Sequence, residues 1–394
     1  MAESTSAESP QPQIAHRWDP FGQTIFVEFS RLALEHGAIN LGQGFPNFDG
    51  PDFIKDAAIE AMRGGENQYA RTQGVPPLNA AIAKRFHADT GLTVDPDAQI
   101  TVTSGCTEAI AATMLGILNP GDEVIIFEPY YDAYPAALAM ARATPRFVTL
   151  CPPDFAFDEN ELRAAFNGNT RAVIVNTPHN PTGKVYTRSE LESIASLCRE
   201  HDVLAITDEV YERLVFEGEH VRMATLPGMW ERTITLSSLG KTFSLTGWKI
   251  GWAIAPEHLT AGVRAGHQYL TFATATPLQH GAAAALAAPD SYYEEYVAAY
   301  RERRDVLQDG LAEVGFAVYP ARGTYFVLAD HTRFGFEDDV SFCRHLVKHA
   351  RVAAIPPSAF YHDPAHGRKL VRFAFCKDVE TLREAVERMR GGLT

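Results

Sequence analysis

Six short apolar runs between residues 99 and 255 constrain the fold more than any other feature of this 394-residue chain. Helix-like segments and turn clusters such as Asn-Pro-Gly-Asp (119–122) separate the runs. Apolar strands that alternate with helices predict a mainly parallel sheet covered by helices on both faces. Ligands of such sheets bind outside the carboxyl ends of the strands, so the residues after each run are candidates for a site. The runs are 99–102, 123–127, 172–175, 204–207, 233–236 and 250–255.

The pattern changes near residue 291, where residues 291–314 form the signature of one long amphipathic helix with a charged outer face. Strand-like stretches at 316–319, 324–329 and 371–375 follow, with a helical stretch at 340–350 and a final helix. We therefore expect a smaller α+β domain beside the large one. The expected boundaries are a disordered tail at 1–14, a segment joining the small domain at 15–50, a large domain at 51–290 and a small domain at 291–394.

Composition excludes several classes of function. A formal charge of −14 opposes binding to nucleic acid phosphates, and no run of ~18 apolar residues could span a membrane. The first residues lack the basic start and apolar stretch of a secretion signal. Five cysteines, odd in number and without a CxxC pair, indicate a reducing cytoplasm. His345 and His349 lie four residues apart without a third ligand nearby, so no metal site is predicted.

Residues 237–252, SSLGKTFSLTGWKIGW, follow one of the apolar runs and place Ser238, Lys241 and Lys249 among three glycines. A lysine held on a small-residue turn among apolar neighbours is costly to bury unless its amine is neutral or covalently used. Schiff-base chemistry with an aldehyde cofactor uses a lysine in this way. The alternative is a surface lysine after a strand, and this segment alone does not decide between the two.

Polar residues follow two further runs. Asp208 ends the run at 204–207, where a carboxylate either caps a helix or pairs with a buried cation such as a pyridinium nitrogen. Asn180 lies in the string NTPHNPTGK (176–184), where it is either a turn residue or a donor to a cofactor oxygen. For both Asp208 and Asn180, the residues alone do not decide between the structural and the functional interpretation.

The run at 99–102 leads through Gly105 and Cys106 into an alanine-rich helix, an arrangement that binds phosphate through free backbone N–H groups. Ser238 and Lys249 could add a hydroxyl and a charge. Tyr131 follows another run and belongs either to the core or to a surface that stacks on a flat ring. Arg372, inside the apolar stretch LVRFAF, either extends its guanidinium to solvent or recognises a carboxylate.

From about Trp18 onward the chain resembles the fold-type I, class I/II pyridoxal-phosphate aminotransferases. Within them it is most similar to the kynurenine aminotransferase (glutamine transaminase K) branch with its bacterial methionine-type and succinyldiaminopimelate-type relatives. This resemblance implies an α/β fold with a mainly parallel seven-stranded sheet in the large domain and a smaller α+β domain. The strings that carry it are NLGQGFP (40–46), NQY (67–69), NTPHNPTGK (176–184), ITDEVY (206–211), LPGMWER (226–232) and residues 238–252.

The resemblance also implies a role for each matching residue. Lys241 would hold pyridoxal 5′-phosphate as a Schiff base and move the substrate proton, while Asp208 would pair with the pyridine nitrogen. Asn180 and Tyr211 would hold the phenolate oxygen of the ring, and Tyr131 would stack on it.

The remaining implied contacts concern the phosphate and the substrate. The phosphate contacts would come from Gly105, Cys106, Ser238 and Lys249, together with Tyr69 of a second subunit in a homodimer. The α-carboxylate contacts would come from Gly44, Asn180 and Arg372. Two stretches depart from the kynurenine branch. Gly105-Cys106-Thr107 occupies the position where that branch has Gly-Gly-Tyr, and residues 272–275 replace a stretch that contains a Phe-His pair in that branch.

The implied activity is transfer of an amino group from a neutral or aromatic L-amino acid to a 2-oxo acid such as 2-oxoglutarate, by a ping-pong mechanism. Methionine, glutamine and kynurenine-like donors fit a site with one carboxylate-binding arginine, near Phe26, Phe45, Tyr131 and Phe272. Alternatives are cysteine-S-conjugate β-lyase activity in the same site, or N-succinyldiaminopimelate transamination assisted by Arg17 or Arg71. A transcriptional regulator is disfavoured because no helix-turn-helix pattern precedes the large domain.

Overall fold

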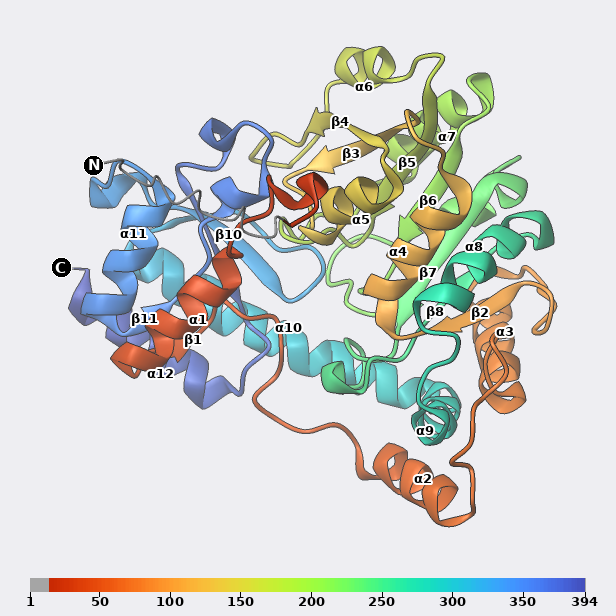
Figure 1. Cartoon of the computed structure of the whole chain (residues 1–394). Helices are drawn as coiled ribbons and strands as arrows, with labels where there is room; N and C mark the ends of the chain where they lie inside the picture. The colour runs from red at the N-terminus through yellow and green to blue at the C-terminus, as the bar shows by residue number, and fades with distance from the viewer. Residues whose placement is uncertain (1–13, 394) are drawn as a thin grey trace, which may run out of the picture.

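A seven-stranded sheet forms the centre of the protein (Figure 1). The structure is a computed structural model that describes residues 14–393, so the tail expected at 1–14 lies almost wholly outside the described residues. The strand order is β2-β8-β7-β6-β5-β3-β4. Strands β3 to β7 run parallel to one another, whereas β8 is antiparallel to both β2 and β7. The strands are β2 (Ile100–Thr103), β3 (Glu123–Glu128), β4 (Thr144–Thr149), β5 (Thr170–Asn176), β6 (Leu204–Asp208), β7 (Thr233–Ser238) and β8 (Gly251–Ile254).

Both faces of this sheet are buried under helices, as the continuous apolar runs predict. Along β3, Val124 and Ile126 belong to one core cluster, while Ile125 and Phe127 belong to another on the opposite face. Helices from the segments between strands cover these faces. They are α4 (Gly105–Ile117), α5 (Ala133–Ala141), α6 (Glu159–Ala165), α7 (Arg188–Glu200) and α8 (Glu257–Leu270). The end of the sheet at β2 packs against α2 (Asp52–Arg63), α3 (Pro76–Thr90) and α9 (Thr276–Leu286).

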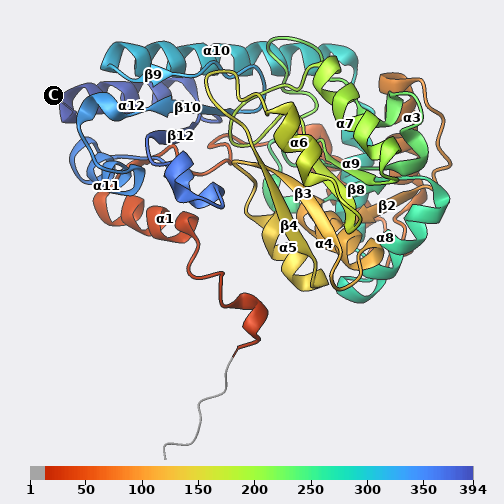
Figure 2. The ribbon, with the colours of Figure 1, turned by 90° about the horizontal axis from the view of Figure 1, so that it is seen from above.

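The C-terminal part of the chain forms a second, three-stranded antiparallel sheet of order β12-β10-β9. The 25-residue helix α10 (Asp290–Val314) leads into it and runs along one side of the whole molecule (Figure 2). A two-residue parallel pairing of β1 with β11 attaches the N-terminal segment here. The elements are β9 (Ala317–Val318), β10 (Phe326–Asp330), β12 (Leu370–Ala374), β1 (Ile39–Asn40), β11 (Val352–Ala353), α1 (Ile25–His36), α11 (Asp339–His345) and α12 (Val379–Gly392).

The mainly parallel sheet and the six predicted strands are confirmed, with three differences. Strand β4 was not predicted, because it is an edge strand with a single buried residue, Val148, and Pro145 and Arg146 interrupt the apolar pattern. The helix expected at 340–350 is α-helical to His345 and continues as a π-helical turn, Leu346–Ala350. The pairing of β1 with β11 was too short to predict. The division at residues 50 and 290 stays a prediction, and no helix in residues 14–393 is long and apolar enough to cross a bilayer.

Candidate active site

A cavity of about 380 Å³ opens where the carboxyl ends of β5, β6 and β7 face the three-stranded sheet. The sheet register brings the predicted residues together, because Asn176 pairs with Asp208, and Asp208 pairs with Leu236 on the strand that leads to Lys241. Eleven of the twelve predicted site residues line this cavity. They are Gly44, Gly105, Cys106, Tyr131, Asn180, Asp208, Tyr211, Ser238, Lys241, Lys249 and Arg372.

The Lys241 amine has an unusual environment for a charged group. Lys241 lies in the turn after β7, and its Nζ is 5.8 Å and 5.6 Å from the ring centroids of Tyr211 and Tyr325. Within the described part of the chain it forms no hydrogen bond or ion pair. Burial lowers the pKa of this amine, which favours the neutral form that can act as a nucleophile or a base. The structure therefore supports the cofactor-site interpretation over that of a surface lysine.

Asp208 is a buried carboxylate, 4% exposed, at the end of β6. The Tyr134 hydroxyl donates to its Oδ2 at 2.8 Å, and the Val210 N–H donates to its Oδ1 at 3.3 Å. The Cys106 thiol lies 3.7 Å from the same Oδ1. Burial raises the pKa of Asp208 even though these hydrogen bonds act to lower it. A cationic group in the cavity would lower that pKa and keep the carboxylate charged, so Asp208 is suited to pair with a pyridinium nitrogen.

The N-terminus of α4 forms an anion-binding cradle. The Ser104 side chain does not cap this helix, so the first backbone N–H groups remain available to a ligand. Gly105 has φ +76°, and a Cβ placed on it would lie 3.1 Å from the Lys249 Nζ. A Cβ on Gly251 would lie 2.5 Å from the Gly105 carbonyl carbon, so only glycine allows this approach. Ser238 pairs with Gly251, and together these groups fit a phosphate.

Arg372 is buried among three aromatic rings, and two of them, Phe26 and Phe326, line the cavity. Its guanidinium carbon lies 4.2 Å, 5.2 Å and 5.3 Å from the ring centroids of Phe326, Phe360 and Phe26. Nη1 donates to the Asn180 Oδ1 at 3.2 Å, and Nη2 donates to the Gly42 carbonyl at 2.9 Å. Nε is buried without a partner, and no carboxylate of residues 14–393 forms an ion pair with this group.

The burial of Arg372 lowers its pKa to about 10. An arginine in this state does not extend to solvent. Asp132 acts on its charge from a distance, but no carboxylate of the described residues forms an ion pair with it. A ligand carboxylate would supply the missing charge and an acceptor for the guanidinium.

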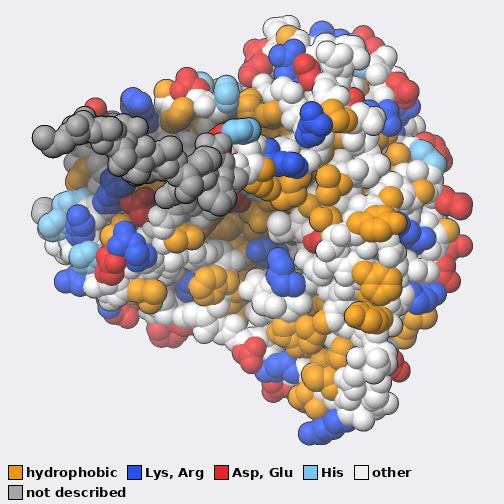
Figure 3. All heavy atoms as spheres, viewed as in Figure 1, with side chains coloured by type: hydrophobic (Ala, Val, Ile, Leu, Met, Phe, Trp, Pro, Cys, Tyr) orange, Lys and Arg blue, Asp and Glu red, His pale blue; other side chains and the backbone are white. Residues whose placement is uncertain are grey.

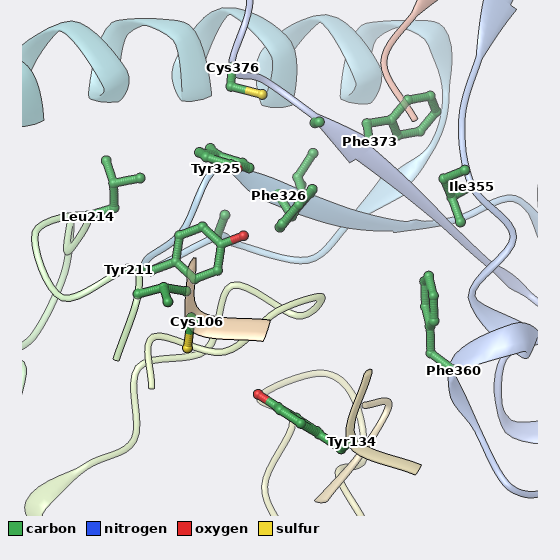
Figure 4. Close-up of a cluster of buried hydrophobic side chains, with 14 of the residues drawn as sticks. Cys106, Tyr134, Tyr211, Leu214, Tyr325, Phe326, Ile355, Phe360, Phe373 and Cys376 are labelled. Atoms are coloured by element: carbon green, nitrogen blue, oxygen red, sulfur yellow. The ribbon is translucent and has the colours of Figure 1, made fainter. Parts of the chain in front are cut away.

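Two tyrosines frame the rest of the cavity. The Tyr211 ring meets the Tyr325 ring edge to face at 5.1 Å, and Figure 4 shows Tyr211 below Tyr325, with Phe326 beside them and Cys376 above. Burial raises the pKa of Tyr211, so its hydroxyl is a neutral donor at physiological pH. The Tyr131 hydroxyl lies 3.5 Å from the Thr107 hydroxyl, and burial raises its pKa to about 12.

Several contributing residues were missed from the sequence. Tyr134 was missed although it follows Tyr131 by three residues and lies in the first turn of α5. Asn176 was read only as part of a turn, yet its amide donates to the Asp208 carbonyl and its Oδ1 accepts from the Asn180 N–H. Phe326, Asp132 and Gln43 also line the cavity, and no role was predicted for them from the sequence.

Tyr69 and Phe272 lie away from this cavity. Tyr69 is 88% exposed, and its ring packs edge to face on Phe272 at 5.5 Å. The expectation that Phe272 lines the substrate site is therefore not met within one chain, because residues 272–275 connect α8 to α9 at the outer end of the sheet. The expected phosphate contact of Tyr69 concerns a second subunit and stays a prediction.

The fold and this cavity define a class of enzyme. The family model for class I and II aminotransferases matches residues 36–389, and the chain belongs to this family, whose members use pyridoxal 5′-phosphate. The residues described above fit that cofactor, since one side of the cavity offers an anion cradle, a lysine amine and a buried carboxylate. The protein is therefore an aminotransferase that acts on amino acids and 2-oxo acids.

Individual relatives cover nearly the whole chain. It is 47% identical to a probable N-succinyldiaminopimelate aminotransferase of Mycobacterium tuberculosis, over 95% of this chain and 97% of that protein. It is 41% identical to the methionine aminotransferase of Escherichia coli, over 94% and 96% of the two chains. The solved M. tuberculosis N-succinyldiaminopimelate aminotransferase superposes with a TM-score of 0.94 at 46% identity, over 96% of this chain and 99% of that one.

Proposed function

We propose that the protein transfers the amino group of a medium or large neutral L-amino acid to a 2-oxo acid such as 2-oxoglutarate, in two half-reactions at this cavity. The observation that carries the proposal is the buried Arg372, whose charge has no carboxylate partner in the described residues and which lines the same cavity as Lys241. Bound pyridoxal phosphate supplies the electron sink that stabilises negative charge at the substrate Cα.

The side chains would divide the remaining work. Arg372 and the Gly44 backbone would hold the substrate carboxylate, with Asn180 fixing the guanidinium. Lys241, whose pKa is lowered by burial, would bind the cofactor through its amine and then take and return the Cα proton as a neutral base. Asp208 would hold the protonated ring nitrogen. The phenol of Tyr211 would donate to the ring oxygen together with Asn180.

The lining supports a neutral donor. Phe26, Phe45 and Phe326 contribute apolar surface, and the basic residues of the lining are Lys241, Lys249 and Arg372. The first two serve the cofactor in this proposal, so a second carboxylate on the donor would find no free cation in the cavity. A pocket of this kind separates neutral side chains by only ~1–3 kcal/mol per methylene, so the donor range should be broad.

A half-reaction screen tests the donor class. The holoenzyme is mixed with single amino acids without an oxo acid, and loss of the absorbance of the lysine-bound cofactor is followed. We expect methionine, glutamine, leucine and aromatic amino acids to react at least tenfold faster than aspartate. A faster reaction with aspartate would refute the neutral-donor proposal and leave the aminotransferase chemistry in place.

A groove of about 930 Å³ beside the cavity favours a second candidate, a long donor with a distal carboxylate. Asp132 lines both spaces, and Arg17 lines the groove. Arg146 in the same groove is paired with Glu123, whereas Arg17 forms no ion pair within residues 14–393. Arg71, the other arginine considered, is engaged by Asp97 at 2.9 Å and does not line either space.

The similarity to N-succinyldiaminopimelate aminotransferases supports this second candidate. Its test is Arg17→Gln, with the exposed Arg171→Gln on β5 as a matched control. If the groove binds a distal carboxylate, Arg17→Gln should lower kcat/KM for N-succinyldiaminopimelate at least tenfold and leave methionine unchanged. Equal kinetics for both variants would exclude Arg17 from donor recognition.

We further propose a homodimer in which Tyr69 reaches the phosphate site of the partner. Its support is a group of large apolar side chains that are exposed on α2, on the loop after it and at the end of α8, where hydrophobic surface gathers at the lower right of Figure 3. Apolar surface of this extent typically marks an interface. The exposed residues are Phe53, Ile59, Met62, Tyr69, Tyr269, Leu270 and Phe272.

A further inference from the structure

The turn that carries Lys241 is held only in part by its own backbone. Within the turn the Phe243 N–H donates to the Leu239 carbonyl and the Leu245 N–H donates to the Gly240 carbonyl. In the described chain no backbone N–H donates to the carbonyls of Lys241 and Thr242 that lie between them. Buried carbonyl groups need donors, so the partners of these two carbonyls matter for the position of the lysine.

Helix α10 supplies both donors through tyrosine hydroxyls. The Tyr296 hydroxyl donates to the Lys241 carbonyl at 2.8 Å, and the Tyr292 hydroxyl donates to the Thr242 carbonyl at 3.3 Å. The two tyrosines lie four residues apart, on one side of the helix, with their rings stacked at 6.4 Å and 11°. Tyr292 also stacks on Phe243 at 5.1 Å. Two successive carbonyls of the lysine turn are thus bound to one rigid helix.

The same helix contacts the part of the molecule that carries Arg372. One turn after Tyr296, Tyr300 stacks on Tyr325 at 6.2 Å, and Tyr325 precedes β10, the strand paired with β12. The C-terminal half of α10 packs on α12 and β9 (Figure 2). Figure 4 shows Tyr325 between Tyr211 and the pale helix at the top of the view. Helix α10 therefore contacts both the turn that carries Lys241 and the C-terminal sheet that carries Arg372.

We propose that Tyr296, assisted by Tyr292, is a positioning residue that fixes the Lys241 amine relative to Asp208 and Arg372. This inference rests on the proposed role of Lys241 as the cofactor lysine. A hydroxyl bonded to the carbonyl of the reacting residue restrains rotation of that peptide unit, and the side chain starts from the same Cα. The Lys241 amine would then approach the cofactor ring from one direction only. The amine must keep this geometry through both half-reactions.

Tyr296→Phe is the direct test, because it removes one hydroxyl and keeps the ring stack. The matched control is Tyr293→Phe on the same helix, whose hydroxyl is buried without a partner and lies outside the active-site cavity. Each variant is measured as holoenzyme for kcat and KM, and for the pH titration of the absorbance of the lysine-bound cofactor. The affinity of the apoprotein for pyridoxal phosphate and the melting temperature complete the comparison.

Loss of one neutral hydrogen bond should lower kcat of Tyr296→Phe by about two- to tenfold, with KM nearly unchanged. The absorbance titration should shift by a few tenths of a pH unit or more, since the freed turn changes the contacts of the amine, while Tyr293→Phe matches the wild type. Tyr292→Phe should show a smaller effect in the same direction, because its hydrogen bond is longer.

Two outcomes separate this inference from the proposed function. If Tyr296→Phe lowers only the melting temperature and keeps the wild-type titration and kcat, Tyr296 is a packing residue and the inference is wrong. Borohydride reduction followed by peptide mapping identifies the lysine that holds the cofactor. A label on a lysine other than Lys241 would overturn the proposed function itself, and this inference with it.

Discussion

Arg372→Met separates recognition of the substrate carboxylate from the stability of the fold. The Arg372 side chain is 2% exposed, and burial lowers its pKa well below the usual range of arginine, to about 10. One pKa unit corresponds to ~1.4 kcal/mol, so keeping this charge buried costs the folded protein about 3 kcal/mol at neutral pH. Methionine removes the charge and keeps an unbranched side chain that packs among Phe26, Phe326 and Phe360.

The substitution also removes two donors. Asn180 Oδ1 and the Gly42 carbonyl would each lose a hydrogen bond from a charged donor, at about 1.5–3 kcal/mol apiece. Removal of the buried charge offsets about 3 kcal/mol of this loss, so Arg372→Met should unfold at or somewhat below the wild-type temperature. Activity should fall steeply, because two charge-assisted hydrogen bonds to a carboxylate are worth about 3–6 kcal/mol together, or about 10²- to 10⁴-fold in kcat/KM.

The assay combines kinetics with thermal unfolding. Steady-state rates with methionine and 2-oxoglutarate give kcat/KM, and 3-phenylpropionate serves as a carboxylate that cannot react. At 100 times its Kd this ligand should stabilise the wild type by about 2.7 kcal/mol and leave Arg372→Met unchanged. The reasoning is refuted if Arg372→Met keeps kcat/KM within tenfold of the wild type, or if the ligand stabilises both proteins equally.

Arg304→Met is the matched control for stability. Arg304 is also buried, but it is paired with Glu217 and Asp305. Its replacement removes both ion pairs and the hydrogen bond to the Ala321 carbonyl, so the melting temperature should fall while kcat/KM stays near the wild-type value. Arg372→Met should therefore lose far more activity than stability, whereas Arg304→Met should lose stability alone.

Three further predictions address the remaining site residues. Lys241→Ala should abolish turnover by orders of magnitude while the apoprotein still binds pyridoxal phosphate, as measured by fluorescence. Asp208→Asn should melt higher than the wild type as apoprotein at pH 7. Burial raises the folded pKa of Asp208 above 3.8, so wild-type stability falls as the pH rises through that window, and the difference should vanish below pH 3.8. The holoenzyme of this variant should lose most of its activity, and wild-type rates would refute its role. Tyr69→Ala and Lys241→Ala should each be inactive as homodimers but regain activity when unfolded and refolded together, since a hybrid has one complete site; light scattering that shows an active monomer would contradict this.

The sequence predicted those parts of the fold that depend on local patterns. The runs that became β3, β5 and β6 are apolar on both faces, and that composition indicates central parallel strands regardless of their neighbours. The edge strand β4 has one buried residue, so it gave no such signal. The antiparallel insertion of β8 between β2 and β7 depends on the pairing of β8 with β2, about 150 residues earlier, which no local pattern contains.

The same distinction applies to the active site. Lys241, Asp208 and Asn180 became candidates because each lies at or after the end of a strand, and the ends of parallel strands meet at one edge of the sheet. Their roles were implied by the family resemblance. Tyr134 and Tyr296 lie on helices that pack against that edge, and their hydroxyls donate to Asp208 and to the Lys241 carbonyl. In the sequence, both tyrosines look like ordinary core residues. Their partners could be identified only from the packing of α5 and α10 against the ends of β6 and β7.

The buried charges of the cavity together specify what it binds. Asp208 is a carboxylate whose pKa burial raises, and Arg372 and Lys241 are bases whose pKa values burial lowers. Each shift means that the protein alone disfavours the charged form, and none of the three forms an ion pair within the described residues. A cationic ring nitrogen at Asp208 and a carboxylate at Arg372 would compensate these two buried charges. In the proposed function the cofactor relieves the cost at Asp208, and the substrate carboxylate relieves the cost at Arg372. The requirement for a carboxylate at Arg372 does not depend on the donor side chain. This supports the proposal of a donor range that is broad in side chain but limited to amino acids.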